Sequence, residues 1–362
     1  MDVATTSSSS QAAWTPAEEE AMRAALDAAR TGQRGANPLV GAAVLAEGRV
    51  AALGWHRGAG APHAEVEALA QARRAGTDLS RATVVVTLEP CHHHGRTGPC
   101  TQAILEAGVR RVVYATEDPT PRARGGAQAL RRCGLSVVSG LLAREAASLN
   151  HRWLRAVAQD RPFVTAKVAQ SLDGRTAAVD ATSQWITGVQ ARAHAHQLRA
   201  RCDAVLVGTG TLLADDPRLS ARDPQGRDLP DQPLRVVMGT TEVPPGAALR
   251  SGRWCHLRTR DPHEALAQLA GQGVRHLLVE GGARVTTAFL AQDLVDSLVV
   301  YQAPLLLGAG AASVADLGVT TLTQARRLEL DREPVRLGED VLLELSPVER
   351  VPPAPAVPSV PA

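Results

Sequence analysis

Residues that can bind a metal ion stand in two short segments of the first third of the chain. His63 is followed two positions later by Glu65, and Cys91 and Cys100 flank a stretch of eight residues. One imidazole and two thiolates make three ligands for a tetrahedral zinc ion and leave the fourth position for water, as in catalytic sites. Zinc lowers the pKa of its bound water to about 7, and a carboxylate such as Glu65 can pass the released proton to a departing nitrogen. These residue types predict hydrolytic removal of an amino group from a pyrimidine or purine carbon.

The expected secondary structure places these residues at the ends of elements. A β-branched run over 84–88 predicts a buried strand that ends just before the first cysteine. A helix over 64–75 follows the histidine, and another over 101–108 follows the second cysteine. A helix N-terminus favours thiolate over thiol, which suits metal binding. A structural zinc knuckle or two buried cysteines is the alternative, but no fourth ligand is placed to close such a site.

The composition describes a globular chain without a strongly charged partner. The 362 residues suggest two domains, and a hydrophobic fraction of 44% is enough for sizeable cores. A formal net charge of +2 gives no reason to expect nucleic acid or a membrane as partner. No apolar run reaches the length of a membrane span, and the Ser/Thr-rich N-terminus lacks the features of a secretory signal. Five scattered cysteines fit a reducing compartment, so we expect a cytoplasmic protein.

Helices and strands alternate along both halves, which predicts two layered α/β domains. In the first half, a capping box at Thr15 starts a helix that runs to about residue 30, and one long helix is expected over 141–157. In the second half, strands are expected at 163–169, 204–207, 234–238, 276–279, 298–301 and 341–345. The expected organisation is a disordered tail over 1–14, a first domain over 15–158, a second domain over 162–346 and a disordered tail over 347–362.

Lysine occurs once, at Lys167, although the chain has 39 basic residues. A lone lysine suggests a site that needs the compact ammonium group or its adjustable pKa. The segments Gly208-Thr209-Gly210 and Gly308-Ala309-Gly310 lack the third glycine of a dinucleotide fingerprint, so we interpret them as turns. Glu280-Gly281-Gly282 instead ends a strand and opens a helix, where backbone N–H groups could hold a phosphate.

The order His63, Glu65, Pro90-Cys91 and a second cysteine is the signature of zinc-dependent deaminases. Two residues between the cysteines are usual, and the eight found here resemble one branch of that superfamily, the bifunctional riboflavin-biosynthesis deaminase–reductases (RibD family). The second half resembles the reductase domain of the same family. The matching segments are Lys167 with 171–175, and then 183–187, 213–217, 279–282 and 294–296, and the whole resemblance covers about 18–345.

The resemblance implies a fold, two activities and two cofactors. The fold would be a cytidine-deaminase-like three-layer domain followed by a dihydrofolate-reductase-like α/β domain. One zinc ion would serve the deamination of 2,5-diamino-6-(5-phosphoribosylamino)pyrimidin-4(3H)-one, and NADPH would then reduce the ribosyl side chain to ribityl. The implied partner is a small phosphorylated pyrimidine, and relatives of this kind are commonly homo-oligomers.

The resemblance also assigns residues. In the first half, His63, Cys91 and Cys100 would bind zinc, Glu65 would move the proton, and Asn37, His56, His93 and Arg96 would line the pocket. His56 and Arg96 suit a substrate phosphate, whereas His92 is expected in a solvated loop without a metal role.

In the second half, the resemblance places Lys167 and Glu280 on either side of the reacting carbon. The cofactor would be held by Ala169, Trp185, Thr211, Asp215, Gly282, Ala283, Arg284, Val285, Thr286 and Thr287. The ribityl phosphate would be held by Ser183, Arg199, Leu219, Arg222 and Glu280. Arg199 and Arg222 suit a phosphate on charge grounds as well.

Departures from the family pattern keep alternatives open. Gly239 stands where aspartate is usual and Leu305 where lysine is usual, so the reductase could be impaired. The main alternative is therefore a deaminase with a non-catalytic second domain. A deaminase acting on RNA would need a basic face, which a net charge of +2 does not favour. A zinc-stabilised binding protein would keep its function without Glu65.

Overall fold

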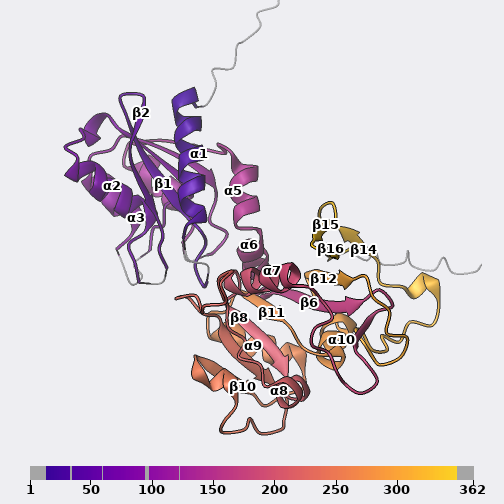
Figure 1. The fold of residues 1–362 in the computed structure, drawn as a ribbon. Helices are drawn as coiled ribbons and strands as arrows, with labels where there is room; N and C mark the ends of the chain where they lie inside the picture. The colour runs from indigo at the N-terminus through magenta and orange to yellow at the C-terminus, as the bar shows by residue number, and fades with distance from the viewer. Residues whose placement is uncertain (1–13, 33–34, 59, 94–97, 122, 349–362) are drawn as a thin grey trace, which may run out of the picture. The chain divides into compact units, whose positions relative to one another are not determined.

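The computed structural model describes residues 14–32, 35–58, 60–93, 98–121 and 123–348. The chain divides into two compact units between Arg161 and Pro162, and each unit has its own sheet (Figure 1). Most of both expected tails lies outside the described residues. At their inner ends, Trp14 packs against a core of the first unit, and Pro347 ends a strand of the second, so both belong to the folded units.

The first unit contains a five-stranded sheet. Its elements are α1 (Pro16–Arg30), β1 (Gly41–Ala46), β2 (Arg49–Trp55), α2 (Ala64–Arg74), β3 (Thr83–Leu88), α3 (Cys100–Glu106), β4 (Arg111–Thr116), α4 (Gly126–Arg132), β5 (Ser136–Ser139), α5 (Ala143–Leu149) and α6 (His151–Gln159). The strand order is β2-β1-β3-β4-β5, in which β3, β4 and β5 are parallel and β1 is antiparallel to both of its neighbours.

Alternation along the strands of the first unit explains its layers, because successive side chains of a strand point to opposite faces. On β1, Val44 belongs to the core that includes Leu69 of α2. Its neighbour Ala43 belongs to the core that includes Met22 of α1. The sheet is therefore covered on both faces by helices, α2, α3 and α4 on one and α1 and α5 on the other. This confirms the predicted three-layer arrangement.

The single helix predicted over 141–157 is wrong, because the chain forms two helices that meet at Asn150. The buried side-chain amide of Asn150 accepts a hydrogen bond from the Leu39 N–H at 2.8 Å and donates one to the Leu39 carbonyl, also at 2.8 Å. Asn150 thus fixes the chain just before β1. Helical periodicity carries no information about such a distant contact.

The second unit is built on a nine-stranded sheet. Its elements are β6 (Phe163–Ser171), β7 (Arg175–Ala177), α7 (Val189–Ala200), β8 (Ala204–Gly208), α8 (Thr209–Asp215), β9 (Leu234–Met238), β10 (Trp254–Leu257), α9 (Pro262–Gly271), β11 (His276–Val279), α10 (Ala283–Ala291), β12 (Ser297–Ala303), β13 (Ala311–Ala312), β14 (Leu328–Leu330), β15 (Val335–Leu337) and β16 (Asp340–Pro347). The main order is β10-β9-β8-β11-β6-β12-β16-β14, with β15 also paired to β16. The first six strands of this order are parallel.

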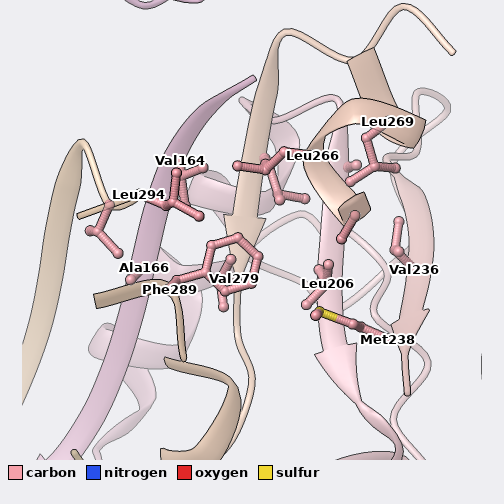
Figure 2. Packing of buried hydrophobic residues seen from close by; sticks show 14 of the residues in the cluster. Val164, Ala166, Leu206, Val236, Met238, Leu266, Leu269, Val279, Phe289 and Leu294 are labelled. Atoms are coloured by element: carbon pink, nitrogen blue, oxygen red, sulfur yellow. The ribbon is translucent and has the colours of Figure 1, made fainter. Parts of the chain in front are cut away.

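Two faces of this sheet carry different side chains. Figure 2 shows the first face, where Val164 and Ala166 of β6 share a core with Leu266 of α9 and Phe289 of α10. The other face packs against α7. Because side chains alternate along a strand, Lys167 of β6 points to the face that α7 covers. A charged side chain therefore lies on this face of the sheet. The α/β fold predicted for this half is confirmed.

The turn predicted at Gly208-Thr209-Gly210 is wrong, because Gly208 ends β8 and the next residue begins α8. A side chain at Gly208 would place its Cβ 2.6 Å from Val285 of α10, so this glycine permits the close approach of that helix. Within the described ranges, no helix is both long enough and apolar enough to cross a membrane.

Candidate active sites

Three elements of the first unit bring the predicted zinc ligands together. His63 is the residue before α2, Cys100 is the first residue of α3, and Cys91 follows β3. The His63 Nδ1 atom lies 3.2 Å from Cys100 Sγ and 3.5 Å from Cys91 Sγ. All three potential ligand atoms lie within 4.8 Å of one another. One nitrogen and two sulfurs that converge in this way fit a single zinc ion.

The electrostatics of the two thiols also fit a cation. Hydrogen bonding from the Cys100 thiol, and then from His63, lowers the pKa of Cys91 to about 4. Hydrogen bonding to Cys91 raises the pKa of Cys100, and burial adds to that rise. In the protein alone, these opposite shifts favour a thiolate on Cys91 and a thiol on Cys100. A metal ion that displaces the remaining proton would find a charged, preassembled donor set.

Glu65 lies in the first turn of α2 and is only 3% exposed. Burial raises its pKa, and the negative charge of Cys91 raises it further. Its carboxyl group hydrogen-bonds with the Cys100 side chain. The structure thus places a buried carboxyl group directly beside the ligand cluster, as the His-x-Glu spacing predicted.

Asn37 and His56 form a fixed pair near this cluster. The His56 Nδ1 atom lies 3.3 Å from the Pro62 carbonyl oxygen, and its Nε2 atom lies 2.9 Å from Asn37 Nδ2. If Nδ1 donates to the carbonyl, Nε2 must accept from the amide, which fixes the orientation of Asn37. Burial lowers the pKa of His56, so the ring acts as a neutral hydrogen-bonding link rather than as a cation.

The histidine run differs from residue to residue. The Nδ1 atom of His93 is buried and has no hydrogen-bond partner among the described residues. His92 is exposed, and its Nδ1 lies 3.0 Å from Thr101 Oγ1. Arg96 lies outside the described residues, so its predicted phosphate contact stays a prediction.

In the second unit, two neighbouring strands bring Lys167 and Glu280 together. Strand β6 pairs in parallel with β11, with Ala166 opposite Val279, so Lys167 of β6 and Glu280, the residue after β11, lie at the same level. The Lys167 Nζ atom lies 3.1 Å from Glu280 Oε2. Glu280 is almost fully buried. These two residues, predicted to flank the reacting carbon, are thus direct partners.

Arg199 of α7 completes this cluster in a way that the sequence did not predict. Its Nε atom donates to Glu280 Oε1 at 2.6 Å and its Nη2 atom to Oε2 at 2.8 Å. Burial alone would raise the pKa of Glu280, but the charges of Arg199 and Lys167 outweigh burial and hold it well below its usual range. The carboxyl group is therefore an ionised carboxylate between two cations. A buried glutamate is rarely found without a charged partner. The position of Glu280 directly after an apolar strand could therefore have indicated that it has a basic partner.

The predicted cofactor residues occupy several elements around this cluster. Ala169 is half-buried on β6, and Trp185 is exposed, with the Arg192 guanidinium 4.6 Å from its ring centroid. The Thr211 hydroxyl accepts a hydrogen bond from the Gly282 N–H at 3.1 Å, which links α8 to the start of α10. Asp215 is exposed at the end of α8.

The predicted pyrophosphate segment divides into an outer and an inner part. Gly282 and Arg284 are exposed, whereas Ala283 and Val285 are half-buried. Thr286 and Thr287 are buried; the first donates to the Gly281 carbonyl at 3.1 Å, and the second accepts from the Ala315 N–H at 2.8 Å. The exposed N-terminal end of α10 is therefore the part of this segment that can reach a ligand.

The predicted substrate residues lie partly in the segment between α8 and β9. Leu219 is buried, and Arg222 donates to Ser220 Oγ at 3.1 Å and lies 3.4 Å from Asp228. Ser183 is half-buried before α7. The departure at Gly239 has a local cause: its φ is 141°, and a Cβ there would lie 2.8 Å from Thr209 Oγ1.

Comparisons with known proteins agree with both sites. The family model described as "Cytidine and deoxycytidylate deaminase zinc-binding region" matches residues 15–116, and "RibD C-terminal domain" matches residues 162–343. The chain is 45% identical to the riboflavin biosynthesis protein RibD of Mycobacterium tuberculosis, with 85% of this chain and 90% of that protein covered. It is 38% identical to that of Escherichia coli, with 85% and 93% covered.

Solved structures give the same result. RibD of Acinetobacter baumannii superposes with a TM-score of 0.83 at 35% identity, covering 92% of this chain and 99% of that one. A diaminohydroxyphosphoribosylaminopyrimidine deaminase/5-amino-6-(5-phosphoribosylamino)uracil reductase of Thermotoga maritima superposes with a TM-score of 0.81 at 32% identity, with 92% and 99% covered. Nothing in these comparisons favours a deaminase with a non-catalytic second domain. The chain belongs to the RibD family, the bifunctional riboflavin-biosynthesis enzymes that join a zinc-dependent deaminase to an NADPH-dependent reductase.

Proposed function

We propose that the two sites carry out consecutive steps on one phosphorylated substrate. The first removes an amino group from 2,5-diamino-6-(5-phosphoribosylamino)pyrimidin-4(3H)-one, and the second reduces the ribosyl side chain of the product to ribityl. The observation that supports this most strongly is the presence, in one chain, of a His-Cys-Cys cluster beside Glu65 and a buried Lys167–Glu280 pair. The activities named for the Thermotoga maritima protein agree with this pair of steps.

In the deaminase site, His63, Cys91 and Cys100 would hold the zinc ion, which when bound supplies an activated water for attack on the ring carbon. Glu65 would take a proton at its carboxylate and deliver it to the amino nitrogen, so that ammonia leaves. Asn37, oriented by His56, and His93, whose Nδ1 atom has no hydrogen-bond partner among the described residues, would hold the pyrimidine. Arg96 is proposed to contact the phosphate.

In the reductase site, NADPH when bound supplies a hydride for C1 of the ribosylamine in its open imine form. The C=N bond gains that hydride at carbon and a proton at nitrogen. Because Glu280 is held as a carboxylate, the proton would come from the Lys167 ammonium group. Glu280 would orient that ammonium group and balance its charge.

The remaining predicted residues keep their proposed binding roles. Ala169, Trp185, Thr211, Asp215 and the segment 282–287 would hold NADPH, with Gly282 and Arg284 as its exposed part. Ser183, Leu219, Arg222 and Glu280 would hold the ribityl end of the substrate. For Arg199, also predicted from the resemblance to hold the phosphate, the contacts in the structure point to another role.

We also propose that the protein is cytoplasmic and forms homo-oligomers. No disulfide joins any of the five cysteines, as expected in a reducing compartment. The strand β14 lies at an edge of the sheet with Leu328 and Leu330 exposed, which suits a contact with a second copy. Light scattering on the purified chain tests the second point, and a monomer at micromolar concentration would contradict it.

Two assays on the full chain test the proposed steps. Ammonia release from the diamino compound measures the first site, and NADPH oxidation with the deaminated ribosylamino compound measures the second. We expect the purified enzyme to catalyse both. Failure of either assay, with zinc bound, would show that the corresponding site has been assigned the wrong step.

A further inference from the structure

The contacts of Arg199 do not suit a residue whose main task is to hold a phosphate. A guanidinium group clamps a phosphate or carboxylate through two parallel N–H groups on one edge. In Arg199 the edge formed by Nε and Nη2 is already occupied, because both nitrogens donate to Glu280, at 2.6 and 2.8 Å. The third nitrogen, Nη1, donates to the Ser220 carbonyl at 3.2 Å. The side chain is also only 17% exposed.

The same contacts fix the orientation of Glu280. Oε1 accepts from Arg199, and Oε2 accepts from Arg199 while also facing the Lys167 ammonium group at 3.1 Å. Without the bidentate contact, the carboxylate could rotate away from the lysine. Arg199 therefore determines which oxygen of Glu280 faces Lys167.

Arg199 also connects this carboxylate to the segment that follows α8. The Ser220 carbonyl that accepts from Arg199 also lies 3.0 Å from His196 Nδ1, one turn earlier on α7. The Ser220 hydroxyl accepts from Arg222 Nε at 3.1 Å. Because His196 contacts the same carbonyl, this segment keeps a contact with α7 when Arg199 is changed, whereas the carboxylate loses its bidentate partner.

We propose that Arg199 is a positioning residue of the reductase, which orients the Glu280 carboxylate toward Lys167 and does so independently of the substrate phosphate. The proposal rests on the proposed roles of Lys167 and Glu280 and deepens them. It predicts that Arg199 contributes to kcat, because misplacement of a reacting pair slows the chemical step. A phosphate clamp would instead contribute mainly to KM for the phosphorylated substrate.

The test compares two substrates, the deaminated ribosylaminopyrimidine with its phosphate and the same compound without it. Arg199→Lys keeps a positive charge but cannot make the bidentate contact. We expect it to lower kcat for reduction by about 100-fold with either substrate, with little change in KM. Arg222→Lys serves as the matched control, and its effect should fall on KM for the phosphorylated substrate alone. Binding of NADPH, measured by titration of each variant, shows that the second unit is folded, because ammonia release reports only on the first.

The dependence of kcat on pH gives a second measurement. A general loss of structure would lower kcat without shifting its acidic limb. The charged and titratable groups facing Glu280 are Lys167 of β6, Arg199 and His196 of α7, and Tyr301 of β12. Arg199 contributes the largest of the charges that lower the pKa of Glu280. In Arg199→Gln, burial is less opposed, the carboxylate takes up a proton at a higher pH, and the acidic limb of the kcat profile should move to higher pH.

Two results would overturn the proposal. One is a loss in Arg199→Lys that disappears with the substrate lacking phosphate, which is the behaviour of a clamp. The other is an unchanged acidic limb in Arg199→Gln, or in the equally uncharged Arg199→Met if the glutamine variant does not fold. Glu280→Gln separates this outcome from failure of the proposed function. If Glu280→Gln reduces normally, the catalytic assignment is wrong; if it is inactive while Arg199→Lys is normal, only the positioning role is wrong.

Discussion

The two sites differ in the polar groups that the fold brings together. The first unit assembles three potential metal ligands, and the second places a carboxylate between two cations. The potential ligand atoms of His63, Cys91 and Cys100 lie within 4.8 Å of one another, and the pKa of Cys91 is lowered to about 4, so the cluster offers a thiolate to a metal ion. Glu280, by contrast, lies between Lys167 and Arg199, so the protein itself balances its charge. The first site is thus completed by a metal ion, whereas in the second site the carboxylate already has two cationic partners within the protein.

The largest expected effect is a loss of deaminase activity that leaves reductase activity unchanged. Glu65→Gln keeps the size of the side chain but removes the group that moves the proton, so ammonia release should fall about 10³-fold. NADPH oxidation with the deaminated substrate and the zinc content should remain those of the wild type. Glu67→Gln, on the same helix, is the control, because Glu67 pairs with the exposed Arg57. Near-normal deamination by Glu65→Gln would contradict the assigned role.

The reciprocal change tests the second site. Lys167→Arg keeps the charge but replaces the compact ammonium group with a planar group that cannot serve as a proton donor. NADPH oxidation should fall about 100-fold, while ammonia release stays unchanged. Reduction at the wild-type rate would show that this lysine is not the proton donor.

The sequence predicted the first site more fully than the second. Each zinc ligand lies in a short segment with its own local signal, namely a strand end or a helix start, and Glu65 is two residues from His63. Arg199 and Glu280 are 81 positions apart, and only the fold shows that they are partners. Alternation along β6 and β11 could place Lys167 and Glu280 on one face, but not the helix that covers it.

The same reasoning explains which elements were predicted. Five of the six parallel strands were predicted, namely β6, β8, β9, β11 and β12, because their apolar runs are strong local signals. The sixth, β10, was missed. The helix α9 was missed although Asp261 and Pro262 form an N-terminal capping signal, in which Asp261 accepts from the His263 N–H at 2.9 Å. The break at Asn150 could not be predicted, because its cause is a contact with Leu39, 111 positions away.

A substitution at Asn150, between α5 and α6, should lower the stability of the first unit. Asn150→Ala removes two hydrogen bonds and leaves the Leu39 backbone groups without their partner, so unfolding of the first unit should become easier by about 3 kcal/mol. Thermal inactivation of deaminase activity measures this change. Ser148→Ala, an exposed position in α5, should have little effect. Equal inactivation temperatures for both variants would contradict the structural role of Asn150.

The smallest expected effect is a pH-dependent loss of stability in the first unit. Burial opposes ionisation of Glu18, but its hydrogen bonds with Arg111 and Thr15 outweigh burial and lower its pKa below the ordinary value of 4.5. Because the folded pKa is lowered, this contribution is present above pH 4.5 and is lost as pH falls through the folded pKa. Glu18→Gln should lower the stability by about 2 kcal/mol at pH 7 and by less at acid pH. Glu19→Gln, whose carboxylate is exposed, is the control; a pH-independent difference would contradict this account.

The most direct test of the account is the rate of NADPH oxidation when the full chain is supplied with the deaminated ribosylaminopyrimidine phosphate. This substrate bypasses the zinc site and isolates the site in which Gly239 and Leu305 depart from the family pattern. The account predicts rapid oxidation by the wild type and by Glu65→Gln, with loss in Lys167→Arg. No oxidation by the wild type, with ammonia still released from the diamino precursor, would contradict the assignment of a second catalytic site to this chain.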